Sequence, residues 1–351
     1  MRRIMLLAAL PVALFWPAVP AASAGDDHPG VHGTVWITDR QNDRVAIYDA
    51  YAGTLIAVLN SEPVPDPAAA DEPNDVAVAA GKAYVTNEAS GTISVFDADT
   101  HALRARLTAG PKPHHVASSP SGRLVAYGVY GTNEVGIVDT RTDTIRRLRA
   151  SHRSGTVLTH SASFAPDGRT VYTANEIRSG GTHLAGTVSE IDTETGAIRC
   201  ELEVGLRPSE VAVAPDGRIG FASVRNEHAI KEIDFGVCRL TGRAVDVGEE
   251  VDTLDLAPDA RSVTVGLRGP APRPARVALV DLVSLRDIRY WTIPGGTLTG
   301  HQWTSPNRRF TYAAFEGAGA GLAVIDHWVG TVSTLTPIGG RPHGIAFTHL
   351  Q

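Results

Sequence analysis

The sequence predicts an all-β protein, a single seven-bladed β-propeller whose blades each hold four strands. Three observations lead to this prediction. Short alternating, β-branched runs recur in groups of four at intervals of roughly 45 residues. One run in each interval ends in an aspartate, and a proline-containing turn recurs with similar spacing. Strand-rich repeats of this length are typical of propeller blades rather than of helical solenoids.

The first 24 residues are predicted to be a signal peptide, which we exclude from the fold. Arg2-Arg3 precedes an apolar stretch from Ile4 to Phe15, and Ala22-Ser23-Ala24 provides a small-residue cleavage site. The apolar stretch is shorter than the roughly 20 residues that a membrane-spanning helix needs, and no other segment qualifies. We therefore expect a periplasmic or secreted protein without a membrane span, cleaved after Ala24, whose residues 25–351 form the propeller.

The seven aspartates that end strand-like runs are predicted to form turns. A carboxylate at the end of a strand can accept a hydrogen bond from the backbone two residues on and so start the turn to the next strand. These residues are Asp49, Asp97, Asp139, Asp192, Asp234, Asp281 and Asp326.

The proline turns mark the ends of the innermost strands. They occupy residues 119–122, 165–168, 214–217, 257–260 and 305–308. Proline presets φ at the second position, and glycine at the fourth position can adopt the left-handed conformation. Ala260 and Arg308 replace that glycine in two of the turns, so we expect these two to be strained or differently shaped.

The two ends of the chain are predicted to complete one blade together. Innermost strands are expected near residues 76–79, 116–119, 162–165, 211–214, 254–257, 302–305 and 345–348. No strand follows the last of these, whereas residues 34–39, 45–49 and 54–59 supply three strands that lack an innermost one. Closing the ring in this way removes the open sheet edges, which gives seven blades in one domain.

The segment Tyr84-Val85-Thr86-Asn87 resembles the signature of the YVTN-repeat β-propellers. Weaker echoes stand at residues 172–175, 221–224 and 312–315, so the resemblance covers essentially the whole chain after residue 24. The resemblance implies the propeller fold but not one activity. Similar propellers include surface-layer and binding proteins, and related ones carry copper, haem d1 or lactonase chemistry.

Charge and cysteine content narrow the function. The formal net charge of −6 becomes −8 without Arg2 and Arg3, which disfavours nucleic acid, because a nucleic-acid partner needs a basic surface. Cys200 and Cys238 fall near the outer strands of neighbouring blades, and the sequence leaves open whether they pair. They lack the Cys-x-x-Cys spacing typical of redox catalysis.

Candidate site residues concentrate just before the innermost strands. In an up-and-down blade, the connections that enter the first strand and those between the second and third strands emerge on one face, around one mouth of the channel. Five of the 13 histidines occupy the two positions before these strands, where random placement would put about half a histidine. The predicted ligand-binding residues are Asp75, His114, His115, His160, Glu210, Asp252, His301 and His343.

The loops between second and third strands should add charged residues to the same mouth: Arg40, Glu88, Glu134, Glu176, Arg225, Glu227, Arg268 and Glu316. Two interpretations stay open for this collection. Imidazoles and carboxylates from several blades can hold a copper or iron ion, or a haem, with His114, His115 and His343 as candidate metal ligands. Alternatively, the polar side chains cap strand ends across a water-filled channel. No compact metal motif is present, and a seven-bladed mouth is wide enough that opposed histidines need not meet.

The sequence therefore predicts an extracytoplasmic binding module. Its ligand, a protein, a polymer or a small molecule, would bind at the histidine- and acid-rich mouth of the channel. One enzymatic alternative is a metal- or haem-dependent oxidoreductase. The other is acid–base catalysis around Glu210, as in propeller lyases and lactonases that resemble this fold.

Overall fold

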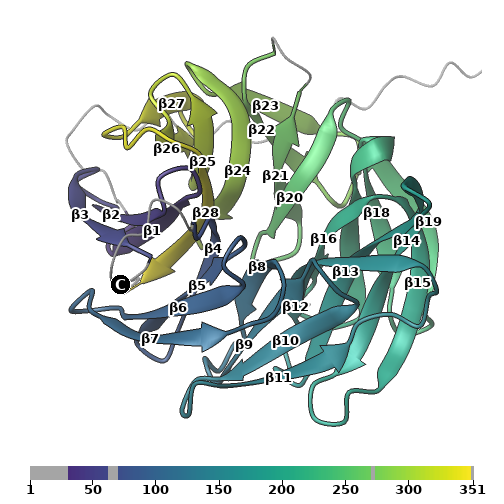
Figure 1. Cartoon of the computed structure of the whole chain (residues 1–351). Coiled ribbons are helices and arrows are strands. Elements are labelled where there is room, and N and C mark those ends of the chain that lie inside the picture. The colour runs from purple at the N-terminus through teal and green to yellow at the C-terminus, as the bar shows by residue number, and fades with distance from the viewer. Residues whose placement is uncertain (1–30, 62–69, 270–272, 349–351) are drawn as a thin grey trace, which may run out of the picture. The chain divides into compact units, whose positions relative to one another are not determined.

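Seven four-stranded antiparallel sheets follow one another in the part of the chain that the computed structural model describes (Figure 1). The structure describes residues 31–61, 70–269 and 273–348, so the predicted signal peptide lies outside the described residues. The arrangement confirms the prediction of an all-β, seven-bladed propeller. Within the described ranges, no helix combines the length and the apolar character needed to cross a membrane.

Blade 1 is built from both ends of the described chain. Its innermost strand is β28 (Pro342–Thr348), which pairs with β1 (Thr34–Asp39) and is followed outward by β2 (Arg44–Asp49) and β3 (Leu55–Asn60). Ile345 of β28 lies opposite Ile37 of β1 in antiparallel register. The predicted closure of the ring is therefore confirmed.

Each of the other six blades uses four consecutive strands, from the innermost outward. Blade 2 holds β4 (Pro73–Ala79), β5 (Lys82–Asn87), β6 (Thr92–Asp97) and β7 (Leu103–Thr108), and blade 3 holds β8 (Pro113–Ser118), β9 (Leu124–Val129), β10 (Glu134–Asp139) and β11 (Thr144–Arg149). Blade 4 holds β12 (Thr156–Phe164), β13 (Thr170–Ser179), β14 (Thr182–Asp192) and β15 (Ile198–Leu206). Blade 5 holds β16 (Pro208–Val213), β17 (Ile219–Val224), β18 (Ala229–Asp234) and β19 (Arg239–Asp246), with the short helix η1 (Arg225–Glu227) after β17. Blade 6 holds β20 (Glu250–Leu256), β21 (Ser262–Arg268), β22 (Arg276–Asp281) and β23 (Ile288–Thr292), and blade 7 holds β24 (Gly296–Thr304), β25 (Phe310–Gly317), β26 (Gly321–Asp326) and β27 (Thr331–Thr334).

Apolar side chains fill the layers between neighbouring blades. Tyr84 of blade 2 packs in one cluster with Tyr127 of blade 3, and Tyr48 of blade 1 packs with Tyr312 of blade 7. Both faces of the middle strands are covered in this way, which explains their nearly continuous apolar sequences. Each blade therefore depends on its two neighbours for the burial of its apolar surface.

The seven strand-end aspartates form turns, as predicted. Asp49 accepts a hydrogen bond of 2.9 Å from the backbone N–H of Tyr51, and Asp281 accepts one of 2.7 Å from that of Ser284. The other five accept equivalent bonds from the backbone two or three residues on.

The five proline turns share one shape. Gly217 has a φ of 69°, and Ala260 and Arg308 adopt similar values of 53° and 59°. The N–H of Ala260 donates to the carbonyl of Ala257 over 2.8 Å, as the N–H of Gly217 does to that of Ala214 over 2.9 Å. The turns at Ala260 and Arg308 therefore keep the shape of the others and are strained. A residue with a side chain costs about 1–2 kcal/mol in the left-handed region.

Replacing Ala260 by glycine should stabilise the protein. Relief of the left-handed strain exceeds the backbone entropy that glycine adds to the unfolded chain, so Ala260→Gly is expected to raise the free energy of unfolding by about 0.5–1 kcal/mol. Urea denaturation measures this change. The matched control is Gly217→Ala, which should lower the stability by about 1 kcal/mol. Equal stabilities for wild type and both variants would contradict the prediction.

A disulfide joins the outer strands of blades 4 and 5. Cys200 lies in β15 and Cys238 directly precedes β19, with their Cα atoms 5.6 Å apart and their sulfur atoms bonded. Cys200 and Cys238 are therefore paired, which the sequence alone left open. It closes a loop between residues 38 positions apart.

Removing the disulfide should destabilise the protein by about 3–4 kcal/mol, because a crosslink over a loop of this length restricts the unfolded chain. The change is the double substitution Cys200→Ser with Cys238→Ser, and urea denaturation with and without dithiothreitol is the measurement. Dithiothreitol should weaken the wild type and leave the double variant unchanged. An effect of the reductant on both proteins would show that it acts elsewhere.

Candidate functional site

A β-bulge interrupts the innermost strand pair of every blade at the same level. In blade 4, Thr159 pairs with Asn175 and Ser161 with Ala174, which leaves His160 without a partner on β13. The other six blades carry the same irregularity, at Asn74, at His114 and His115, at Ser209 and Glu210, at Asp252, at Gly300 and His301, and at His343 and Gly344. Bulges re-aim side chains out of the regular pleat. The bulges therefore bring the predicted site residues together.

Blades approach one another very closely at this level. A Cβ atom on Gly344 would lie 2.4 Å from the Cα atom of Asp75, and one on Gly300 would lie 2.5 Å from the carbonyl oxygen of His343. Glycine is required at these two bulge positions because any larger residue would push neighbouring blades apart.

Five histidine rings meet at the centre. The ring centroid of His115 lies 4.1 Å from that of His301 and 5.6 Å from that of His343. The rings of His114 and His160 lie 4.5 and 4.6 Å from it. Blades 1, 3, 4 and 7 contribute these rings, so the expectation that histidines from opposed blades need not meet is wrong.

Hydrogen bonds to the next blade orient three of the histidines. Nδ1 of His114 lies 3.1 Å from the carbonyl oxygen of His160, Nδ1 of His160 lies 2.9 Å from that of Ser209, and Nδ1 of His343 lies 3.2 Å from that of Asn74. A carbonyl oxygen only accepts, so each Nδ1 carries the proton and each Nε2 keeps a lone pair. These bonds support the strand-capping interpretation and at the same time present Nε2 to the centre.

Asp75 and Glu210 also join neighbouring blades. Asp75 accepts a 2.9 Å hydrogen bond from the N–H of Val116 in blade 3, and Glu210 accepts one from the N–H of Leu254 in blade 6. The second oxygen of Glu210 lies 3.1 Å from Nδ1 of His115, and His301 has both carboxyl groups within 3.8 Å of its Nδ1. Burial raises the pKa of both carboxyl groups above the usual range.

Two ring nitrogens at the centre have no partner. Among the described residues, Nε2 of His115 and Nε2 of His301 are buried without a hydrogen bond. Two histidine triads have ligand atoms within 4.8 Å of one another, His114 with His115 and His160, and His115 with His301 and His343. The predicted ligands His114, His115 and His343 are thus divided between two triads that share His115.

Charges distinguish the two triads. Arg225 donates a 3.0 Å hydrogen bond to Nε2 of His160, which uses the lone pair and places a positive charge beside the first triad. The second triad instead contacts the carboxyl groups of Asp75 and Glu210. Burial lowers the pKa of four of the histidines well below 6.5, namely His114, His115, His160 and His343.

Asp252 belongs to a salt-bridge network rather than to the histidine cluster. It is fully buried and pairs with Arg225 and Arg268. Although burial opposes it, the two guanidinium groups hold the pKa of Asp252 below its usual value. Its carboxylate is therefore occupied by two fixed cations.

A layer of charged and aromatic side chains covers the histidines on the face where β1 joins β2. Arg40 pairs with Glu88 over 2.5 Å, and the buried Glu176 lies 3.6 Å from Arg225. Tyr130 stacks on His114 with ring centroids 5.2 Å apart.

Tyr130 was missing from the sequence prediction, although the repeat contains a signal for it. It follows β9 as Arg40 follows β1 and Glu88 follows β5. Glu134 and Glu227, which were predicted for this layer, instead pair with Arg147 and Lys231. Glu316 pairs with Arg341 at the rim of the layer.

On the other side of the histidines, the channel is hollow. A cavity of about 470 Å³ extends along the innermost strands. His115, His301, Asp75 and Glu210 line it at one end, and its walls combine valine and alanine with polar residues such as Ser163 and Gln302. Trp303 and Phe347 stack within it with centroids 3.9 Å apart. The histidine cluster therefore separates a covered face from an open chamber, rather than lying at an open mouth as predicted.

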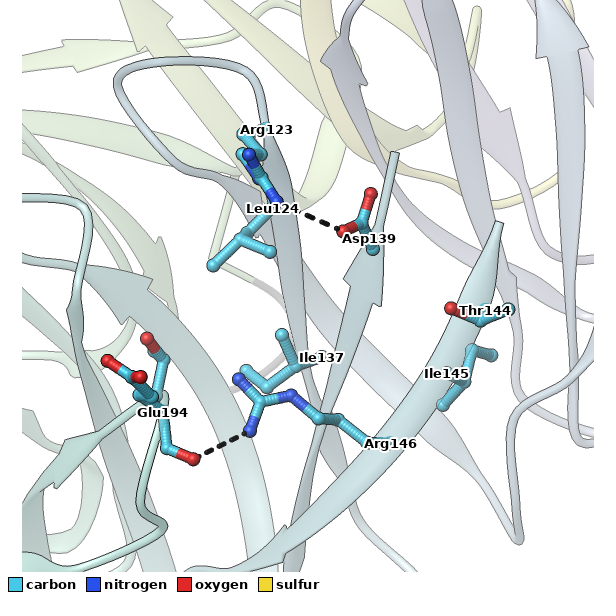
Figure 2. A pocket seen from close by; sticks show the side chains of 9 residues that line it. Arg123, Leu124, Ile137, Asp139, Thr144, Ile145, Arg146 and Glu194 are labelled. Atoms are coloured by element: carbon cyan, nitrogen blue, oxygen red, sulfur yellow. Dashed lines mark hydrogen bonds and ion pairs between the residues drawn. The ribbon is translucent and has the colours of Figure 1, made fainter. Parts of the chain in front are cut away.

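A second hollow of about 400 Å³ lies between blades 3 and 4 (Figure 2). Arg146 donates to the carbonyl oxygen of Glu194 over 3.3 Å, and Arg123 lies 3.7 Å from Asp139. None of the predicted site residues lines it, so we regard it as an ordinary groove between blades.

Comparisons with known proteins support the fold alone. No protein-family model and no curated protein matches the sequence, so the resemblance to YVTN-repeat propellers stays a prediction. The solved structure of Kuenenia stuttgartiensis hydrazine synthase is similar, with a TM-score of 0.67 and 16% identity over 95% of this chain and 99% of that chain. So is the dihydro-heme d1 dehydrogenase NirN in complex with DHE, with a TM-score of 0.61 and 15% identity over 93% of this chain and 77% of that chain.

Replacing Asp255 in the chamber wall should stabilise the protein at alkaline pH. Burial raises the pKa of Asp255 from 3.8 to about 7, so the folded state binds a proton that the unfolded chain has lost. Stability contributed by this group therefore falls as pH rises from about 4 to 7. Asp255→Asn is expected to be more stable than wild type at pH 8, on the order of 2 kcal/mol, with the gap closing near pH 4.

Urea denaturation across this pH range measures the gap. Asp259→Asn, an exposed turn substitution, is the control and should show no such trend. A gap for Asp255→Asn that stays constant with pH would contradict the assignment.

Proposed function

We propose that this protein is an exported metal-binding propeller that holds one transition-metal ion on His115, His301 and His343. The observation that carries the proposal is the pair of buried, unpartnered Nε2 atoms of His115 and His301 beside the oriented ring of His343. A buried nitrogen without a partner costs about 1–3 kcal/mol, and coordination of a cation would remove that cost.

The surroundings of this triad suit a cation. Metal-bound histidines commonly direct their other ring nitrogen at a carboxylate or a backbone carbonyl, which orients the ring and raises its basicity. His115 has Glu210 in this position, His301 has Glu210 and Asp75 at a longer distance, and His343 has the carbonyl of Asn74. The proposal therefore keeps the predicted binding module and makes its ligand a metal ion.

Imidazole ligation favours a late first-row ion. Copper(II) is expected to bind most tightly, since affinities of nitrogen sites for divalent ions rise to copper along that row. A haem is less well supported, because Tyr130 stacks on His114 and the charged layer covers the neighbouring rings. NirN is a dehydrogenase, which supports an oxidoreductase as the enzymatic form of this proposal.

Export is supported by two independent features. The first 24 residues have the composition of a signal peptide. The disulfide between Cys200 and Cys238 is of the kind that persists in oxidising compartments.

Metal titration tests the proposal. Protein stripped with chelator should bind about one equivalent of copper(II) in calorimetry, and elemental analysis should find it after gel filtration. His115→Ala and His301→Gln are expected to weaken binding at least 100-fold. Glu210→Gln should weaken it 10- to 100-fold, because it replaces the carboxyl group that orients His115.

His152→Ala, which removes an exposed histidine, is the matched control and should bind as wild type does. Circular dichroism shows whether each variant is folded, and His301→Gln keeps the test valid if His115→Ala is not. Copper binding that is equal in wild type and His301→Gln would refute the metal site and leave the capping interpretation.

A further inference from the structure

We infer that the ligand completing the coordination of the proposed ion is a small uncharged molecule, which enters through the chamber along the innermost strands. The inference rests on the proposed function for the metal itself. Three features of the described residues carry it: the covered face, the open chamber and the charges that line that chamber.

Among the described residues, ion pairs and an aromatic ring cover the histidines on the face where β1 joins β2. Arg40 with Glu88, and Arg225 with Glu176 and Asp252, form ion pairs over the histidines. Tyr130 stacks on His114 and meets the ring of His160 edge to face, with centroids 5.4 Å apart. His343 is only 2% exposed.

The chamber reaches the triad from the other side. His115 and His301 both line it, and His301 is the one member of the triad that is not fully buried. A volume of about 470 Å³ corresponds to roughly 16 water molecules, given about 30 Å³ for each in the liquid. The chamber therefore has room for a small molecule and is too small for a folded protein.

The lining of the chamber selects against anions. No described residue that lines it is a lysine or an arginine. The ionisable residues besides histidine are three carboxyl groups, Asp75, Glu210 and Asp255. On its way to the ion, an anion would lose hydration beside these carboxyl groups with no lysine or arginine to compensate, and that transfer is costly whichever of the groups is ionised. An uncharged molecule avoids this cost.

A thiol placed in the chamber tests the selectivity without any metal. Ala117 is half-buried and lines the chamber, and both native cysteines are in the disulfide, so Ala117→Cys supplies one reactive thiol. Iodoacetamide and iodoacetate have similar size and differ in charge. The ratio of their alkylation rates at pH 8 should favour the neutral reagent at least 10-fold more than in Ala318→Cys, which places the thiol in an exposed turn.

A substitution that narrows the chamber tests the route to the ion. Ala212 lines the chamber in blade 5, and Ala212→Phe should slow carbon monoxide binding to copper(I)-loaded protein at least 10-fold, measured by infrared absorption. Its copper content should stay at the wild-type value. Ala318→Phe is the matched control and should bind carbon monoxide as wild type does.

The outcomes separate the two proposals. An alkylation ratio equal to that of Ala318→Cys, or carbon monoxide binding unchanged by Ala212→Phe, would overturn the inference while the metal site stands. Absence of copper from the wild type would overturn the metal site, and the alkylation ratio would still decide whether the chamber selects uncharged molecules.

Discussion

The bulge that each blade carries at one level of its innermost strand pair is the constraint on which the centre of this propeller depends. A regular pleat would send alternate side chains into the layers between blades, as happens further along these strands. The bulge instead re-aims side chains at the same level of all seven blades. The same side chains then bond to the next blade, as Nδ1 of His160 does to the carbonyl of Ser209. The residues that form the candidate site therefore also hold neighbouring blades together.

Charge is arranged in layers around this centre. Arg225, Asp252 and Glu176 form a buried ionic layer on one side, and Asp75 with Glu210 lies on the other. A buried ion pair gives little net stability, since desolvation offsets its Coulomb attraction, but loss of one partner is costly. The ionic layer of Arg225, Asp252 and Glu176 therefore resists any change that would separate its charged partners. Between the layers, burial lowers the pKa of His114, His115, His160 and His343, which favours the neutral form in which imidazole binds metals.

Much of the fold could be predicted from sequence because each element has a local signal. The strand-end aspartates, the proline turns and the strand without a partner near residues 345–348 define seven blades and their closure. The site was predicted only as a set of positions. Strand register is a property of two paired strands, so the bulges could not be read from one strand alone. Distances across the channel depend on how seven sheets tilt, which is why the meeting of His115 with His301 was not foreseen. Tyr130 was missed because charged residues alone were sought in its loop.

The two interpretations of the histidines are distinguished by which ones the blades need. Joining blades requires only a short hydrogen-bonding side chain: Ser209 bonds to the carbonyl of Asp252 with a hydroxyl, over 2.7 Å, where His160 uses a ring. His115 and His301 make no bond of this kind to a neighbouring carbonyl, and each leaves Nε2 buried and unpaired. Strand capping therefore leaves the Nε2 atoms of these two residues unexplained, and a serine or an apolar side chain would avoid the cost of the unpaired nitrogen. The proposed cation, bound by both rings, would remove this cost.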